Sequence, residues 1–207
     1  MKEYPQIPYL TTGQKFREIS GAYIFDKLDG SSMRSEWSRK KGWFKHGKRH
    51  GLLDDSNPHL KVVPEIFEKT LAEPLGKIAR DNRWQELVVF YEFWGDKSFA
   101  GLHEEGDPKF LSLFDVAVDK KGFLSPSEFI KTFDGKVPTA TFLGNYNWTR
   151  GFAQMVWDMD IPGVTFEGVV GKAGERHGIV RAKAKTRAWI EKVHHVYQDK
   201  ADLIINS

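Results

Sequence analysis

Short apolar segments of strand length recur along this chain, and they restrict the fold more than any other feature of the sequence. Turn residues bound several of them, and Asp119-Lys120-Lys121-Gly122 is typical of a hairpin loop. Because the segments arrive in consecutive pairs and outnumber the helical ones, the sequence indicates an α+β protein with antiparallel sheets. We predict strands over residues 21–27, 33–37, 42–45, 87–93, 111–118, 137–143, 164–171 and 178–185.

Fewer segments have helical character. Residues 64–82 place apolar side chains at helical spacing, with a kink expected at Pro74. Residues 126–133 follow Ser125-Pro126-Ser127-Glu128, which is typical of an N-cap with a capping box. The other helices are predicted over residues 147–158 and 187–203.

The composition excludes several classes of protein. The 207 residues include no cysteine, which rules out disulfides, thiolate zinc sites and thiol nucleophiles. The first residues lack the apolar core of a signal peptide, and no window approaches the roughly 18 apolar residues of a membrane span. We therefore expect a cytoplasmic protein without a membrane partner, folded as one domain over residues 1–207.

Basic residues gather in one stretch although the net charge is only +3. Two interpretations are open. The stretch is either a solvated face or a surface that follows phosphates while its aromatic residues stack on bases. The cations are Arg34, Arg39, Lys40, Lys41, Lys45, Lys48 and Arg49, and the interleaved aromatic residues are Trp37, Trp43 and Phe44.

Lys27 ends the first predicted strand and precedes the polar turn Leu28-Asp29-Gly30-Ser31. A lysine at the end of a buried strand, followed by a tight turn, is typical of a nucleophile at the mouth of a pocket. Further along the chain, the carboxylates Glu92, Asp115 and Glu167 interrupt apolar strands.

The last predicted strand alternates cations with small residues. Strand periodicity places Arg181, Lys183 and Lys185 on one face. Three cations facing inward require anionic partners, because burying an unpaired charge is costly.

Taken in order, these motifs resemble those of the covalent nucleotidyltransferases, the superfamily of ATP-dependent RNA and DNA ligases and mRNA capping enzymes. The likeness extends over about residues 21–186. It departs from the usual pattern at Tyr91, where glycine is common. The matching motifs are Lys27-Leu28-Asp29-Gly30, Tyr91-Glu92, Phe114-Asp115, Glu167-Gly168-Val169-Val170 and Lys183-Ala184-Lys185.

Within the superfamily the chain looks most similar to phage-type RNA ligases. DNA ligases and capping enzymes usually carry arginine where this chain has Ser32, and a basic Lys48-Arg49-x-Gly51 follows instead. The resemblance is also compatible with a phage origin. It implies the ATP-grasp-like fold of ligase adenylation domains, in which antiparallel sheets flanked by helices hold the nucleotide pocket between them.

The chain continues for only 22 residues after Lys185. This is too short for the oligonucleotide-binding (OB) barrel of DNA ligases or for the C-terminal domain of the better-known RNA ligases. We therefore expect a minimal, monomeric enzyme without such a domain, and an accessory protein is one way to supply it.

The resemblance implies that Lys27 forms a lysyl-AMP intermediate with ATP. The amine must be neutral to attack phosphorus, and we expect neighbouring cations and a bound metal to lower its pKa. Lys183 and Lys185 are the other expected catalytic residues, because they would contact the α-phosphate and neutralise its charge.

Other motif positions are expected to bind ATP. Glu92 would accept hydrogen bonds from the ribose, and Phe114 would stack on adenine, although a phenylalanine here is equally explained as core. Asp26 would offer a backbone contact to the base, while Asp29-Gly30 would shape the loop. Arg49 would hold a phosphate, because a guanidinium binds phosphate bidentately.

The resemblance also implies a Mg²⁺ or Mn²⁺ ion held by Glu167, with Asp29 assisting. The predicted RNA contacts are Arg34, Lys48 and Arg49, and Arg34 is an alternative to Arg49 as the phosphate ligand.

The favoured function is ATP-dependent joining of a 5′-phosphate end to a 3′-hydroxyl end of RNA. A minimal DNA ligase is one alternative, since no residue that reads the 2′-hydroxyl is evident. A noncatalytic RNA-binding module with a relic nucleotide pocket is the other, and the presence of all motif lysines and carboxylates argues against it.

Overall fold

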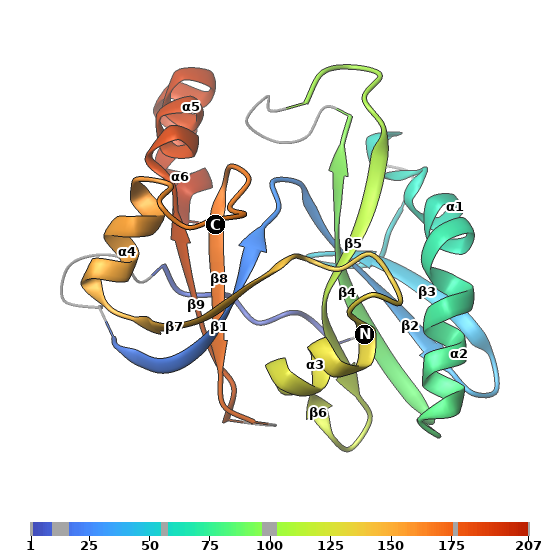
Figure 1. Cartoon of the computed structure of the whole chain (residues 1–207). Helices are drawn as coiled ribbons and strands as arrows, with labels where there is room; N and C mark the ends of the chain where they lie inside the picture. The colour runs from blue at the N-terminus through green and yellow to red at the C-terminus, as the bar shows by residue number, and fades with distance from the viewer. Residues whose placement is uncertain (1, 10–16, 55–57, 97–102, 176–177, 207) are drawn as a thin grey trace.

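Two antiparallel sheets side by side form the centre of the computed structural model, which describes residues 2–9, 17–54, 58–96, 103–175 and 178–206 (Figure 1). Sheet A has the order β7-β1-β8-β9, and sheet B has the order β3-β2-β4-β5-β6. The α+β class with antiparallel sheets is confirmed. The strands of sheet A are β1 Ile19–Lys27, β7 Phe142–Trp148, β8 Gly168–Ala173 and β9 Val180–Lys185, and those of sheet B are β2 Ser31–Ser38, β3 Gly42–Lys48, β4 Glu86–Gly95, β5 Lys109–Val118 and β6 Gly122–Phe123.

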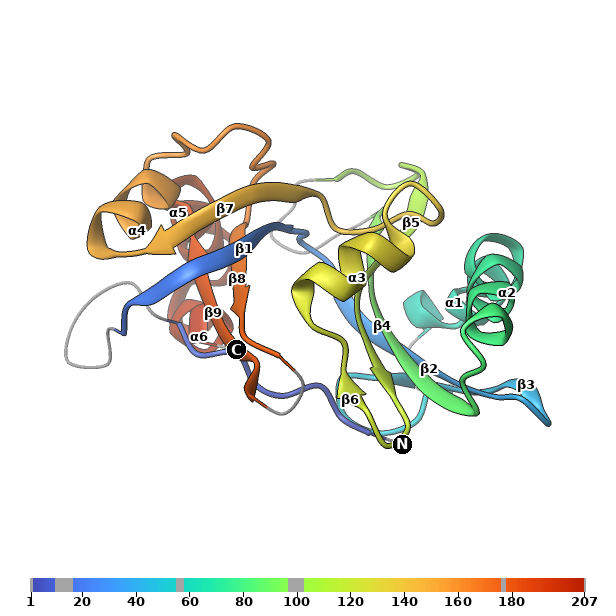
Figure 2. The same ribbon diagram turned by 60° about the horizontal axis from the view of Figure 1, so that its bottom comes forward.

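Helices cover the outer faces of both sheets (Figures 1 and 2). On sheet B, α1 (Val63–Phe67) and α2 (Glu73–Asp81) are joined by a π-helical turn, η2 (Glu68–Ala72). A kink was expected at Pro74; the structure instead has a π-helical turn that ends two residues before the proline, which lies in the first turn of α2. The remaining elements are η1 Pro58–Leu60, α3 Pro126–Phe133, α4 Arg150–Trp157, α5 Arg187–Tyr197, η5 Gln198–Lys200 and α6 Ala201–Asn206.

The apolar side chains form separate cores. The largest lies between sheet B and its helices and includes Phe67 and Tyr91. A second lies between sheet A and α4 around Trp148, and a third joins α5 to α6 around Trp189. The capping box predicted at the start of α3 is present: Glu128 N–H donates to Ser125 Oγ at 3.3 Å, and Ser125 N–H donates to Glu128 Oε2 at 3.0 Å.

The turn after Lys27 carries the chain from sheet A to sheet B (Figures 1 and 2). Lys27 is the last residue of β1, and Ser31 is the first of β2. Gly30 lies so close to the carbonyl oxygen of Phe93 that a Cβ atom there would collide with it. The glycine of the motif is therefore required by the close approach of β4, and the turn fixes Lys27 at the junction of the two sheets.

Two predictions around β7 are wrong. The strand expected over 137–143 is instead β7, and the preceding residues are extended, with one parallel bridge between Thr139 and Leu113. The helix expected from residue 147 begins at Arg150, because Thr149 is its N-cap and accepts from the Phe152 N–H at 3.1 Å.

Two boundaries near the C-terminal end also differ. The strand expected from residue 164 begins at Gly168, because Thr165 bonds to the Asp26 carboxylate rather than to a neighbouring strand. The helix expected over 187–203 is interrupted at Gln198, which has a φ of 43°. Among the described residues, no helix is long and apolar enough to cross a membrane.

Candidate active site

A pocket of about 540 Å³ lies where the two sheets meet. Its lining includes residues of the N-terminal segment, of the turn between β1 and β2, of strands β1 to β5, β8 and β9, and of the C-terminal helices. Every site residue predicted from the sequence lines it except Arg34. These are Asp26, Lys27, Asp29, Gly30, Lys48, Arg49, Glu92, Phe114, Glu167, Lys183 and Lys185.

Glu167 joins two of the motif lysines. Its Oε1 atom lies 2.8 Å from Lys27 Nζ and 3.3 Å from Lys185 Nζ. Two sets of hydrogen bonds fix the position of Glu167. The Asp26 carboxylate accepts from the backbone N–H and the hydroxyl of Thr165, and the Glu167 carbonyl accepts from the Thr186 N–H at 3.0 Å. Motifs far apart in sequence thus share one ion-pair network.

Lys27 is held as an ammonium group. Burial lowers its pKa, but Glu167, Glu92 and Asp29 together raise the pKa above the ordinary lysine value. The expectation that neighbouring cations lower this pKa is therefore wrong for the protein without ligands. The reason is geometric, because the nearest charges to the amine are carboxylates.

The pKa values of Lys183 and Lys185 shift in the opposite direction to that of Lys27. Burial lowers the pKa of Lys183 to about 7, and the charges of Lys185 and Lys27 act in the same direction. Burial lowers the pKa of Lys185 to about 8, with Glu167 opposing it and Lys27 adding to it. Burial and mutual repulsion thus disfavour the charged forms of both lysines, and an anion such as phosphate at the end of β9 would stabilise these charges.

Two carboxyl groups of the pocket, those of Asp29 and Glu92, have raised pKa values. Burial raises the pKa of Asp29 to about 7, and the charge of Glu167 adds to the effect. Burial raises the pKa of Glu92 to about 8, with Glu167 and Asp29 adding and Lys27 opposing. This concentration of negative charge favours a cation in the pocket.

The donor set fits a hard divalent cation with few protein ligands. Asp29 Oδ2 is buried without a hydrogen-bond partner, and Glu167 is 5% exposed. No group of three or more His, Cys, Asp or Glu side chains among the described residues is arranged to hold a metal. Mg²⁺ commonly uses one or two carboxylates and keeps several waters, so Glu167 and Asp29 are the residues that would hold it.

Tyr4 is a pocket residue that the sequence did not indicate. Its ring meets Phe114 edge-on, with centroids 5.1 Å apart, and both residues line the pocket. The partly exposed Phe114 ring is therefore placed where a base could stack against it. No spacing or motif connects Tyr4 to residues more than a hundred positions away.

A buried polar network lies beside Phe114 and links the two sheets. The Asp115 Oδ2 atom accepts from Tyr4 Oη at 2.8 Å, Arg181 Nη2 at 3.0 Å and Lys172 Nζ at 3.2 Å. The anionic partners expected for the cation row of β9 are thus Asp115 for Arg181 and Glu167 for Lys185.

Trp189 is the other contributor that the sequence did not indicate. It is 1% exposed, and its ring centroid lies 3.8 Å from Lys185 Nζ. Its indole N–H is close enough to Asp29 to lower the carboxyl pKa, without meeting the geometry of a full hydrogen bond.

Arg34 and Asp26 have different surroundings from those expected. Arg34 is 3% exposed and donates to the carbonyls of Lys2 and Gly51 at 3.2 Å each, so it does not lie at a surface open to RNA. Asp26 uses its backbone N–H to bond the Thr141 carbonyl at 2.9 Å, which leaves that group occupied within the protein.

The fold matches solved structures of RNA ligases. An archaeal ATP-dependent RNA ligase matches with a TM-score of 0.67 in each of two forms, at 15% and 17% identity, covering 98% and 94% of this chain and 53% and 51% of the archaeal chains. A Naegleria gruberi RNA ligase mutant with AMP and Mn matches with a TM-score of 0.60 at 21% identity, covering 84% of this chain and 52% of that one.

The chain spans about half the length of the solved structures that it matches. No family model matches the chain, and no curated protein matches its sequence. Over most of its length, the chain shares its fold with these solved structures of ATP-dependent and other RNA ligases.

Proposed function

We propose that the chain is an ATP-dependent RNA ligase that carries AMP on Lys27. The observation that supports this most directly is the convergence of three motifs, in which Glu167 Oε1 lies within 3.3 Å of both Lys27 Nζ and Lys185 Nζ. This group lies in a pocket that is large enough for a nucleotide and flanked by the aromatic ring of Phe114.

In the first step, the neutral amine of Lys27 attacks the α-phosphorus of ATP. A nitrogen–phosphorus bond forms, the bond from phosphorus to the β-phosphate oxygen breaks, and pyrophosphate leaves. Glu167 Oε1 is at hydrogen-bond distance from the amine and is placed to accept its proton. Lys183 and Lys185 would stabilise the charge on the α-phosphate as it reacts.

A divalent cation, when bound, would neutralise phosphate charge and make the ammonium of Lys27 easier to deprotonate. Glu167 and Asp29 are the side chains that would hold it. Glu92 and Phe114 would hold the ribose and the base, so the α-phosphorus would face Lys27 in a fixed orientation.

The later steps use the same pocket. A 5′-phosphate oxygen of RNA attacks the phosphorus of lysyl-AMP, and the Lys27 amine leaves with a proton. A 3′-hydroxyl then attacks the activated 5′-phosphate, a phosphodiester forms, and AMP leaves. The cations Lys48, Arg49, Lys183 and Lys185 line the pocket and would bind the phosphates in both steps.

Incubation of the protein with α-labelled ATP and Mg²⁺ or Mn²⁺ tests the first step. We expect acid-labile label on the wild type and none on Lys27→Ala. Lys77→Ala is a suitable control, because Lys77 is exposed on α2 and pairs with Asp81 in the same helix, outside the pocket lining. Label that persists in Lys27→Ala, or a wild type that takes up none, would contradict lysyl-AMP chemistry.

Sealing of matched nicked substrates tests the nucleic acid. We expect the protein to join 5′-phosphate ends to RNA 3′-hydroxyl strands at least ten times faster than to DNA strands. Equal sealing of an all-DNA nick would favour the alternative of a compact DNA ligase.

A further inference from the structure

A second groove lies on the same face of sheet B as the nucleotide pocket. It has a volume of about 370 Å³, and its lining includes Glu36 and Val88. In the register of β2 and β4, Ser32 pairs with Glu92 at the pocket, and Glu36 pairs with Val88 at the groove. Alternate residues share a face, so pocket and groove lie at two ends of one surface, about 13 Å apart along β2.

The N-terminal segment separates the pocket from the groove. Arg34 and Phe90 form the strand pair between the two sites. Arg34 Nη1 donates to the Lys2 carbonyl at 3.2 Å, and the ring of Tyr4 lies 5.1 Å from that of Phe90. The segment therefore crosses the sheet face here, and the groove beyond it is open to solvent.

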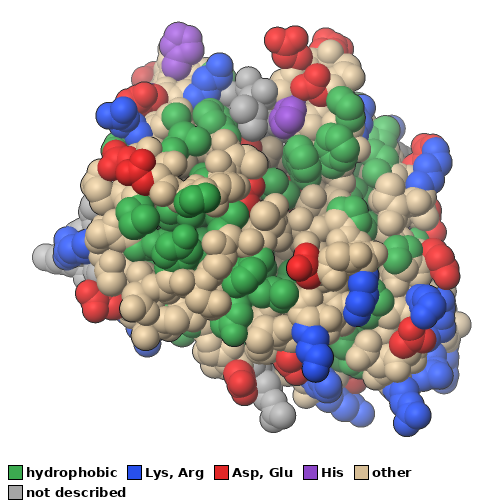
Figure 3. Space-filling view, in the orientation of Figure 1, with side chains coloured by type: hydrophobic (Ala, Val, Ile, Leu, Met, Phe, Trp, Pro, Cys, Tyr) green, Lys and Arg blue, Asp and Glu red, His purple; other side chains and the backbone are tan. Residues whose placement is uncertain are grey.

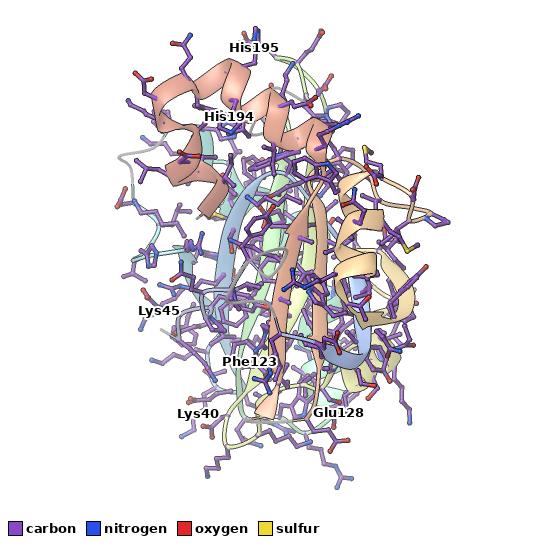
Figure 4. All side chains as sticks on the ribbon, turned by 90° about the vertical axis from the view of Figure 1, so that its left-hand side faces the viewer. Lys40, Lys45, Phe123, Glu128, His194 and His195 are labelled. Carbon is purple, nitrogen blue, oxygen red and sulfur yellow. The ribbon has the colours of Figure 1, made fainter. Side chains whose placement is uncertain are left out.

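The β2–β3 hairpin gives one side of the groove a strongly positive character. Residues 37–53 contain no acidic residue. Arg39, Lys40 and Lys41 are exposed at the hairpin turn. Blue side chains gather toward this lower right part of the molecule in Figure 3. Figure 4 places Lys40 toward the end of the molecule opposite His194 and His195, with Lys45 higher on the left-hand side.

An exposed aromatic ring lies among these cations. Phe44 is 38% exposed and lines the groove. Lys41 Nζ lies 5.2 Å and Lys45 Nζ 5.5 Å from its ring centroid. An accessible ring with cations beside it is the arrangement with which proteins stack a base and hold the adjoining phosphates.

Acidic residues lie in the groove rather than at the hairpin turn. Glu36, Glu86 and Asp119 contribute to its lining, and Lys45 Nζ is 3.8 Å from Glu36 Oε2. Because Lys2 and Lys120 also line the groove, its charges nearly balance, whereas residues 37–53 carry cations and no acidic residue, so a polyanion would be attracted to the hairpin. The charges therefore favour a strand that runs along the hairpin side, over Phe44.

We propose that this hairpin binds the single-stranded RNA that leads away from the end held in the nucleotide pocket. Arg39, Lys40, Lys41 and Lys45 contact successive phosphates, and one base stacks on Phe44. Lys48 and Arg49, at the pocket end of β3, continue the same line of cations. The inference rests on the proposed RNA ligase function and names the surface that holds its substrate.

The test compares two variants with equal changes in charge. One is R39Q/K40Q/K41Q/K45Q. The control is K69Q/K77Q/K192Q/K200Q, whose four lysines are exposed on η2, α2, α5 and η5. A fluorescent, 5′-phosphorylated single-stranded RNA is titrated by anisotropy without ATP, over a series of salt concentrations.

For the hairpin variant we expect weaker binding and a smaller salt dependence. The slope of log K against log salt should fall in magnitude by about two to three, because each phosphate contact on a single strand contributes about 0.7. The control variant should keep the wild-type slope. Identical slopes for the two variants would overturn the proposal.

Phe44 is tested separately from the charges. Phe44→Leu should weaken RNA binding by about tenfold, and Phe44→Tyr should retain it, because only the latter keeps a stacking ring. Equal affinity of the leucine variant and the wild type would exclude the stacking contact. Labelling of Lys27 by ATP should be unchanged in every hairpin variant. A wild type that binds RNA through the hairpin without labelling would refute the ligase chemistry alone.

Discussion

Lys185 Nζ lies 3.8 Å from the centroid of the Trp189 ring, so an aromatic face covers one of the two cations at the end of β9. Thr186 links the two residues, because its hydroxyl caps α5 and accepts from the Trp189 N–H of the backbone at 3.1 Å. The cap thus orients the ring over the lysine that precedes it.

Replacing Trp189 should move the pH dependence of Lys27 adenylation. The ring stabilises the charged form of Lys185, so Trp189→Leu should lower the Lys185 pKa from about 8. A cation–π contact typically contributes about 0.5–2 kcal/mol. The fall in adenylation rate on the alkaline side of the pH profile should therefore occur about 0.4–1.5 pH units lower. A rate profile measured from pH 6 to about 10 checks this, with Trp189→Phe as the conservative control. An unmoved limb would show that the ring does not tune Lys185.

Glu167→Gln should slow adenylation while making Lys27 easier to deprotonate. The carboxylate raises the Lys27 pKa, so the variant should lower it. The same change removes the proton acceptor and a metal ligand, and we expect a loss of about 10²-fold or more in rate. Labelling by α-labelled ATP measures the rate, and reaction of Lys27 with an amine reagent across pH measures its pKa. Glu191→Gln, on the exposed face of α5, is the control.

The ligand-free protein should be less stable near pH 7–8 than at lower or higher pH, because four ionisable groups of the pocket have shifted pKa values. Asp29 and Glu92 have raised pKa values of about 7 and 8, so the folded state holds more protons than the unfolded state and loses stability as the pH rises from about 4. Lys183 and Lys185 have lowered values of about 7 and 8, so the folded state regains stability as the pH rises toward about 10.

Urea unfolding of Glu92→Gln and the wild type tests this dependence. At pH 8 the variant should be more stable by about 1–2 kcal/mol, since it removes a carboxylate that is costly to ionise, and the difference should vanish near pH 5. A constant difference across this range would mean that Glu92 does not titrate abnormally.

Gly30→Ala should damage both the turn and the chemistry. The new Cβ would collide with the Phe93 carbonyl, which belongs to the central strand β4 and cannot rotate away. We expect a loss of about 1–3 kcal/mol in the free energy of unfolding and a strong decrease in Lys27 labelling. Gly178→Ala is the matched control, because a Cβ there meets no atom within 4 Å. Equal stability of the two variants would contradict the close contact.

The sequence predicted which side chains would line one pocket, because most of them belong to short motifs within or beside strands. Lys27, Glu167 and Lys185 were expected in one pocket, and the structure places the Nζ atoms of both lysines within 3.3 Å of Glu167 Oε1. In sheet B, β4 and β5 were also predictable, since their apolar runs are long and bounded by turns, whereas the two-residue strand β6 was not predicted.

Other features depend on three-dimensional neighbours that no local pattern reveals. The direction of the Lys27 pKa shift follows from the carboxylates around the amine, which lie on three different segments. Tyr4 and Trp189 enter the site through contacts across the fold. Arg34 belongs to a basic stretch, yet the N-terminal segment covers it, so its charge faces carbonyl groups instead of solvent.

The Asp115 network has a consequence for how mutations will act on this protein. Lys27 belongs to one sheet, while Glu92 and Phe114 belong to the other, so the amine and the residues proposed to hold the nucleotide are aligned only if the angle between the sheets is maintained. Asp115 of β5 fastens the two sheets together through Lys172 of β8 and Arg181 of β9. We expect substitutions that break these ion pairs to impair the proposed adenylation by changing the angle between the sheets, so variants with impaired sealing should also be sought at Asp115 and Arg181, which do not line the pocket.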